Sequence, residues 1–201
     1  VAKEIEKRVE AQGVHLMFGV TIDHMEQEKG EKTAVLTDGS RIPADIVGLC
    51  IGTRAITETV QGEVEIGRGI VVDDHMRTSV PGIYAAGDCC EGNNLESGQN
   101  QIIGLWANAN HQGETAGINM AGGDMTYKGN ILHNITHFMN MDFIGFGDNR
   151  MQGEILEYGS LSEDLYIRLV IDGKRIVGAN ILDNYRVSGI IKNYMLRLFA
   201  G

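Results

Sequence analysis

Thr78-Ser-Val-Pro-Gly-Ile-Tyr-Ala-Ala-Gly-Asp-Cys89 sets a short apolar run directly before a glycine and a lone carboxylate. Within it, Pro81-Gly82 predicts a turn, and Ile83 to Ala86 is typical of a short strand buried in a parallel sheet. Gly87 has no Cβ, so a ligand can approach its backbone, and Asp88 offers a hydrogen-bond acceptor where the strand ends. Open α/β sheets bind ligands at the carboxyl ends of their strands, so the run predicts a cofactor site at these last two residues.

Two apolar runs farther upstream predict strands of the same kind. The run 67–74 is rich in β-branched residues, which follow the glycines at positions 67 and 69. The run 44–53 ends at Gly52, which again permits close approach of a ligand, and Asp38-Gly39 before it predicts a hairpin turn. These strands indicate an α/β fold.

At this point the chain resembles the FAD-dependent pyridine nucleotide-disulfide oxidoreductases, a family that includes NADH oxidases, rubredoxin reductases and the NADH-dependent subunits of nitrite reductase. Thr78 to Asp88 is similar to the second flavin-binding motif of that family. The resemblance implies FAD as the cofactor, NAD(P)H as co-substrate, and a hydrogen bond from the ribityl chain of FAD to Asp88. Cys50-Ile51-Gly52 departs from the family's usual Ala-Thr-Gly but keeps the glycine.

Downstream, 101–122 predicts a helix with small residues along one face, which permits close packing on a sheet. In the resembling family the amino end of this helix points at the flavin ring. Free N–H groups and the positive end of the helix dipole stabilise negative charge there. The resemblance therefore assigns the backbone of Leu105, Trp106 and Ala107 to FAD. For the Trp106 side chain, a core or interface aromatic is an alternative at least as strong as contact with the ring.

The chain begins at Val1 and contains no Gly-x-Gly-x-x-Gly phosphate loop, whereas a flavoprotein of this kind needs two. We therefore expect the carboxyl-terminal part of a protein with two dinucleotide-binding domains. Residues 2–12 predict an amphipathic helix, and 14–18 and 20–25 predict strands. The expected division is 1–42 for the end of the NAD(P)H-binding domain, 43–125 for the returning half of the FAD-binding domain, and 126–201 for an interface domain.

The last third of the chain predicts this small α+β interface domain. Apolar runs at 135–146 and 154–158 predict strands, and 165–171 with 176–182 predicts a hairpin around an Asp-Gly turn. A helix is expected over 185–199, where apolar residues recur at helical spacing. By the resemblance, this domain would make the contact of a homodimer.

Composition limits the partners. A net charge of −10 argues against nucleic acid, and no apolar run approaches the length needed to cross a bilayer, so we expect a cytoplasmic protein. Adjacent Cys89 and Cys90 lack the spacing of a redox pair and are interpreted as small buried thiols, with Cys50 as a core residue. His133 and His137 lack a third ligand, so no metal site is expected.

Two classes of function follow. The first is an FAD-dependent NAD(P)H oxidoreductase, in which reduced nicotinamide delivers hydride to flavin and electrons pass on to an unidentified acceptor, which could be a protein or a partner subunit. No residue of this chain is assigned to catalysis, because the cofactors carry that chemistry. The second class is a non-catalytic flavoprotein-like scaffold that dimerises or serves as a subunit of a larger complex.

Overall fold

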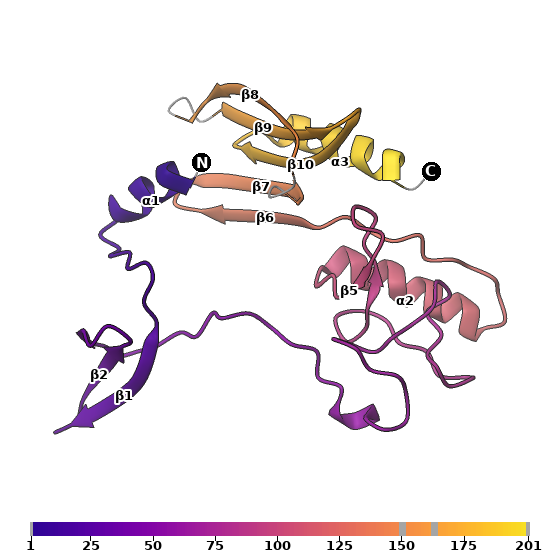
Figure 1. Ribbon diagram of the computed structural model, residues 1–201, viewed down its shortest axis with the longest axis horizontal. Helices are drawn as coiled ribbons and strands as arrows, with labels where there is room; N and C mark the ends of the chain where they lie inside the picture. The colour runs from indigo at the N-terminus through magenta and orange to yellow at the C-terminus, as the bar shows by residue number, and fades with distance from the viewer. Residues whose placement is uncertain (1, 149–151, 162–164, 200–201) are drawn as a thin grey trace. The chain divides into compact units, whose positions relative to one another are not determined.

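The computed structural model describes residues 2–148, 152–161 and 165–199 (Figure 1). The chain divides into two compact units, Val1–Thr53 and Arg54–Gly201, and each is described by itself. Both helices and sheets are present, as the predicted α/β class requires. Within the described residues, no helix combines the length and the apolar character that crossing a membrane demands.

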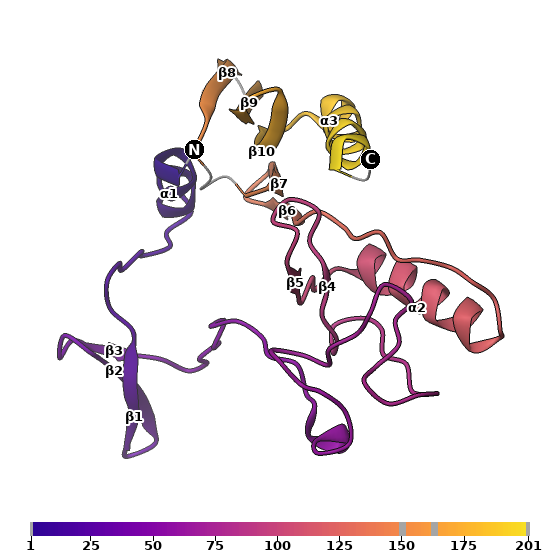
Figure 2. The ribbon, with the colours of Figure 1, turned by 45° about the vertical axis from the view of Figure 1, so that its right-hand side comes forward.

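The first unit contains one helix and a three-stranded antiparallel sheet in the order β1-β2-β3 (Figure 2). The elements are α1 (Ala2–Glu10), β1 (Ile22–Glu28), β2 (Glu31–Leu36) and β3 (Arg41–Pro43). The predicted turn at Asp38-Gly39 joins β2 to β3: Gly39 has φ +86°, and Asp38 Oδ1 accepts the Ser40 N–H at 2.9 Å. The strand predicted over 14–18 is wrong, and the one predicted over 20–25 begins two residues later, at Ile22.

Three further strand predictions are wrong. The segments 44–53, 67–74 and 83–86 contain no regular strand, and the sheets of the described chain are antiparallel rather than parallel. Two of the segments form only isolated bridges, Ile70 with Cys90 and Tyr84 with Arg77. A buried strand needs continuous hydrogen-bonded neighbours on both sides, and among the described residues these segments make only scattered backbone hydrogen bonds.

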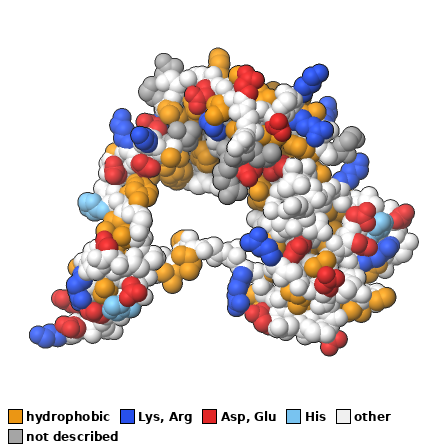
Figure 3. Space-filling view, viewed as in Figure 1, with side chains coloured by type: hydrophobic (Ala, Val, Ile, Leu, Met, Phe, Trp, Pro, Cys, Tyr) orange, Lys and Arg blue, Asp and Glu red, His pale blue; other side chains and the backbone are white. Residues whose placement is uncertain are grey.

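The segment 44–53 leaves apolar side chains exposed because it has no strand partners in the part of the chain that the structure describes. Ile46 is 91% exposed and Ile51 is 85% exposed, although the sequence predicts a buried strand there. Hydrophobic side chains reach the surface along the extended segment after β3 (Figure 3). The apolar pattern of this segment is that of a buried strand, and burial would require further chain beside it.

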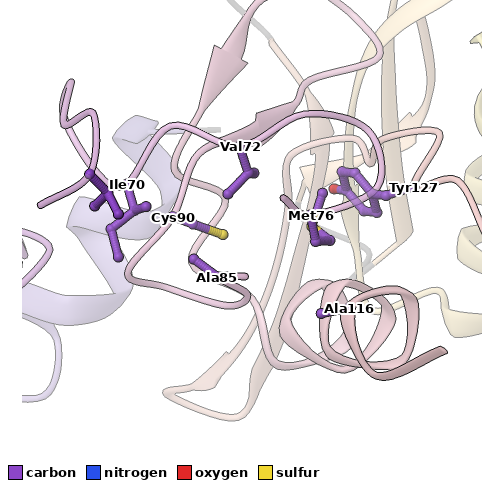
Figure 4. Packing of buried hydrophobic residues seen from close by; sticks show 8 residues of the cluster. Ile70, Val72, Met76, Ala85, Cys90, Ala116 and Tyr127 are labelled. Carbon is purple, nitrogen blue, oxygen red and sulfur yellow. The ribbon is translucent and has the colours of Figure 1, made fainter. Parts of the chain in front are cut away.

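The first part of the second unit is rich in loops around one long helix. Its regular elements are the 3-10 helix η1 (Glu58–Val60), the two-stranded pair β4 (Gly92–Asn93) and β5 (Asn100–Gln101), and α2 (Trp106–Met120). A buried cluster holds the loops to α2: Val72, Met76, Ala85 and Cys90 pack with Ala116 and Tyr127 (Figure 4). The helix starts five residues later than the predicted 101, because β5 and an extended Leu105 (φ −135°, ψ 133°) occupy the segment before it.

The second part is a five-stranded antiparallel sheet in the order β6-β7-β10-β9-β8, with α3 packed on β10. The elements are β6 (His133–Phe138), β7 (Met141–Gly147), β8 (Glu154–Ser160), β9 (Leu165–Asp172), β10 (Arg175–Leu182) and α3 (Tyr185–Phe199). Its core includes Ile144, Ile181 and Met195, each fully buried. The predicted hairpin and last helix are confirmed, and the run 135–146 forms two strands joined by a tight turn.

Candidate functional site

The predicted cofactor-binding residues Gly87 and Asp88 follow the run 83–86, and Gly87 lies in a turn against the side of α2. Gly87 adopts φ +84°, a conformation that favours glycine, and its N–H donates to Gln112 Oε1 at 2.8 Å. A Cβ added at Gly87 would lie 3.5 Å from Ala109 Cβ, so the backbone of the turn approaches the helix closely. The amide of Gln112 thereby fixes the direction in which Asp88 leaves the turn.

Asp88 is exposed and lies beside the entry to α2. Its carboxylate is 3.9 Å from the position that a Cβ on Gly104 would occupy, one residue before the helix cap. The cap is Leu105, whose side chain cannot accept a hydrogen bond, and Trp106 and Ala107 follow as the first helical residues. A carboxylate acceptor and helix N–H donors with a positive dipole end thus lie side by side.

Buried polar side chains of α2 support this arrangement. Tyr127 donates its hydroxyl to Asn108 Oδ1 at 2.5 Å, and Asn108 Nδ2 donates to the Ile103 carbonyl at 3.0 Å. Burial, which desolvates the phenolate form, raises the pKa of Tyr127, so the hydroxyl remains a donor. These contacts tie the segment before the helix to the helix itself. Sequence reasoning missed Asn108 and Gln112, although their spacing of four residues places them on one face.

Five of the six predicted site residues therefore come together: Gly87, Asp88, Leu105, Trp106 and Ala107. The sixth, Gly52, belongs to the unit Val1–Thr53, and a Cβ on it would meet nothing within 4 Å. Its part in the site remains a prediction. The Trp106 side chain is 84% exposed, so the alternative of a core aromatic is wrong, and contact with a ligand or an interface remains open.

The cysteines behave differently from one another. All three are free thiols. Cys90 is buried, as predicted, and desolvation raises its pKa to about 12, which removes the thiolate needed for redox chemistry. Its Sγ lies 3.4 Å from the Gly87 carbonyl, whereas the Cys89 thiol points at the Ala86 carbonyl at the same distance. Cys50 is exposed, so its assignment to the core is wrong for the same reason as the strand that contains it.

One acidic cluster resembles a metal site but is accounted for by ion pairs. Ligand atoms of Asp73, Asp74 and His75 lie within 4.8 Å of one another. Both ring nitrogens of His75 already contact carboxylates, Nδ1 with Asp74 at 2.6 Å and Nε2 with Asp124 at 2.9 Å. The hydrogen bond to Asp74 and then that to Asp124 raise the pKa of His75, which favours the imidazolium over a metal ligand.

Comparison with known proteins assigns the family. The model of the pyridine nucleotide-disulphide oxidoreductases matches residues 1–113, more than half of the 201-residue chain. The chain belongs to this family. Its members use FAD and NAD(P)H, and the match includes the whole Gly87–Asp88 turn and the amino end of α2.

Three relatives illustrate the similarity. The NADH-rubredoxin oxidoreductase of Clostridium acetobutylicum is 31% identical over 77% of this chain and 39% of its own length. The NADH oxidase of Enterococcus faecalis is 32% identical over 62% of this chain and 29% of its own length. The solved structure of a NAD-dependent persulfide reductase from A. fulgidus matches with a TM-score of 0.85 at 26% identity, covering 100% of this chain and 41% of that one. The chain thus spans less than half the length of each.

The residues present fit a flavin. Asp88 supplies an acceptor suited to sugar-like hydroxyls, and the uncapped start of α2 supplies donors suited to the electron-rich edge of a reduced ring. The exposed indole of Trp106 stands at the same place. The site therefore combines an acceptor for the polyol part of a ligand with N–H donors and an aromatic surface for its ring part.

Proposed function

We propose that this chain forms the flavin-closing and interface part of an FAD-dependent NAD(P)H oxidoreductase. The observation that carries the proposal is the position of the Asp88 carboxylate beside Gly104 and the uncapped amino end of α2. Family membership supports the cofactor, and the geometry supports the residues that would hold it.

Each residue has a distinct role in this proposal. Asp88 accepts hydrogen bonds from ribityl hydroxyls, and the N–H groups of Trp106 and Ala107 face the pyrimidine edge of the ring. Gly87 and Gly52 keep the backbone open to close approach. When bound, FAD accepts two electrons from NAD(P)H and passes them to an acceptor. The protein supplies orientation and electrostatic stabilisation rather than a chemical group of its own.

The carboxyl-terminal sheet is the proposed homodimer contact. Its edge strand β8 exposes Ile155, Leu156 and Tyr158 by 52%, 47% and 68%, which is unusual for an unpartnered strand edge in water. A second copy placed along β8 would bury these side chains. The electron acceptor differs among relatives, one of which is named for rubredoxin, so an acceptor protein is proposed here as well. We place the enzyme in the cytoplasm.

The cofactor assignment is tested with Asp88→Ala in the complete encoded protein. Losing a hydrogen-bond acceptor of this kind costs about 1 to 3 kcal/mol, equivalent to roughly 5- to 150-fold weaker FAD binding. Equilibrium titration of the apoprotein, followed by flavin fluorescence, measures the change. Asp172→Ala, at an exposed strand end, is the matched control and should leave affinity unaltered. Equal FAD affinity in the wild type and Asp88→Ala would show that the carboxylate has been misassigned.

The 201-residue chain alone gives a second test. It contains no Gly-x-Gly-x-x-Gly loop for the pyrophosphate, so we expect it to purify colourless and to bind FAD weakly. Purification with stoichiometric flavin absorbance would contradict this. A complete encoded protein that dimerises yet neither binds FAD nor oxidises NAD(P)H would favour the scaffold function instead.

A further inference from the structure

An open cavity of about 460 Å³ lies between α2, the loop after it and α3. Its basic lining is Lys128 from the loop, Lys192 from α3 and His111 from α2. Apolar surface comes from Leu95, Met125 and Leu196. No acidic side chain lines the cavity within the described ranges, although the chain has 27 acidic residues against 17 lysines and arginines. The cavity is therefore a positively charged hollow in a strongly acidic protein.

Lys192 is the unusual member of this lining. It is half-buried, and its ammonium donates a hydrogen bond to His133 Nε2 at 3.4 Å. Among the ion pairs between described residues, none involves Lys192. A hydrogen bond to an uncharged imidazole leaves the ammonium charge without an opposite charge, and partly removing that charge from water costs free energy.

The pKa values of Lys192 and its neighbour His133 reflect the lack of a nearby carboxylate in the described part of the chain. Burial lowers the pKa of Lys192, and burial followed by repulsion from Lys192 lowers the pKa of His133. Two basic groups therefore lie together without an anion between them. A negative charge placed in the adjoining cavity would stabilise the ammonium, and no carboxylate among the described residues lines that cavity.

We propose that this cavity binds a small organic anion, with a phosphate or carboxylate head at Lys192 and Lys128 and an apolar body against Leu95, Met125 and Leu196. The volume lies within the range usual for small-molecule sites. The head group meets two flexible cations, a geometry that suits point-charge recognition of either anion. This inference does not depend on FAD binding, since the cavity lining includes neither Asp88 nor the first turn of α2.

Binding here would join parts of the fold that are distant in sequence. His111 belongs to α2 and contacts Tyr127 edge to face at 5.3 Å, whereas Lys192 belongs to the helix that covers the carboxyl-terminal sheet. A ligand that touches both binds the folded state and not the unfolded chain, so it stabilises the fold by mass action. The expected signature is a melting temperature that rises with anion concentration.

The experiment titrates the complete encoded protein with phenyl phosphate, phenylacetate, phenol and inorganic phosphate by calorimetry and by thermal shift. We expect saturable binding of at least one aromatic anion, weaker binding of inorganic phosphate and none of phenol. The two aromatic anions distinguish a phosphate head from a carboxylate head. Absence of saturable binding for both would overturn the proposal, and equal binding of inorganic phosphate would overturn the apolar part of it.

Two variants locate the site. Lys192→Gln should weaken binding of the preferred anion about tenfold or more, because it removes the head-group charge. Lys174→Gln, in the exposed turn between β9 and β10, is the matched control and should bind like the wild type. If Lys192→Gln fails to fold, Lys128→Gln on the exposed side serves the same purpose with a smaller loss. Binding that survives the charge removal would place the anion elsewhere and refute the proposal.

Discussion

The side chain of Glu96 is the most informative place to perturb this fold. It lies in the loop between β4 and β5, and both carboxylate oxygens are buried without a hydrogen-bond partner among the residues that the structure describes. A Cβ on Gly147 would come within 2.5 Å of Glu96 Oε1, so the carboxylate lies directly over the end of β7. Burial, with a further contribution from the nearby Asp148 carboxylate, raises the pKa of Glu96 from 4.5 to about 7.

This raised pKa gives a stability effect of defined sign. The folded state favours protonated Glu96. The resulting contribution to the free energy of unfolding is fully present below pH 4.5, the pKa in the unfolded chain, and is lost as pH rises through about 7. The difference between the folded and unfolded pKa values corresponds to about 3 kcal/mol at most. Solvent reaches part of the residue, so screening reduces the expected effect to about 1 to 2 kcal/mol.

Glu96→Gln should therefore stabilise the protein at high pH and change it little at low pH. Urea unfolding measured at about pH 5 and about pH 8.5 gives the two free energies, and the variant should gain about 1 to 2 kcal/mol over the wild type only at the higher value. Glu114→Gln, on the exposed face of α2, is the control and should track the wild type at both. A constant offset between Glu96→Gln and the wild type at both pH values would refute the assignment of a raised pKa to this carboxyl.

Three further outcomes follow from the packing. Gln112→Leu leaves the Gly87 N–H without its acceptor and should cost about 1 to 3 kcal/mol of stability and weaken FAD retention, as chemical unfolding and flavin titration would show; unchanged values would remove Gln112 from the site. Maleimide should label Cys90 only after unfolding, and peptide mass mapping that finds it labelled in the native protein would contradict its burial. Gly159 has φ +80°, and the Cβ of Gly159→Ala would clash with the Leu165 carbonyl of β9, so this variant should lower the melting temperature. Gly189 lies in open space on α3, so Gly189→Ala should raise the melting temperature slightly.

How much of the fold the sequence could predict depends on the range of the contacts. The hairpin of β9 and β10 and the helix Tyr185–Phe199 match their predicted bounds closely, because their signals are local: a turn dipeptide, alternation, and helical spacing. The segments 44–53, 67–74 and 83–86 carry equally clear strand patterns but form no strand. Strand formation needs partners, and a pattern of apolar residues does not supply them.

The candidate site was predictable only through the family resemblance. No local pattern places Asp88 beside Gly104, since the two are brought together by the packing of loops on α2. The resemblance assigned Asp88 and the helix start to one cofactor, and the structure brings five of the six residues together. Gly52 shows the limit: a Cβ on it would meet nothing within 4 Å, so the unit that contains it gives no contact that tests its role.

The buried face of α2 explains why the site holds its shape without a sheet beneath it. Asn108, Gln112, Thr115 and Asn119 are all buried, and their spacing of four, three and four residues follows one helical stripe. An inward polar stripe is unfavourable unless each group finds a partner. Here amide groups bond to loop backbone: Gln112 Oε1 accepts from the Gly87 N–H, and Asn119 binds the backbone of His75 and Met125. Among the described residues, Gln112 Nε2 is the member of this stripe that has no partner. Loops that pair with no strand would otherwise leave those backbone groups unsatisfied, so α2 performs for them the role that a neighbouring strand performs in a sheet.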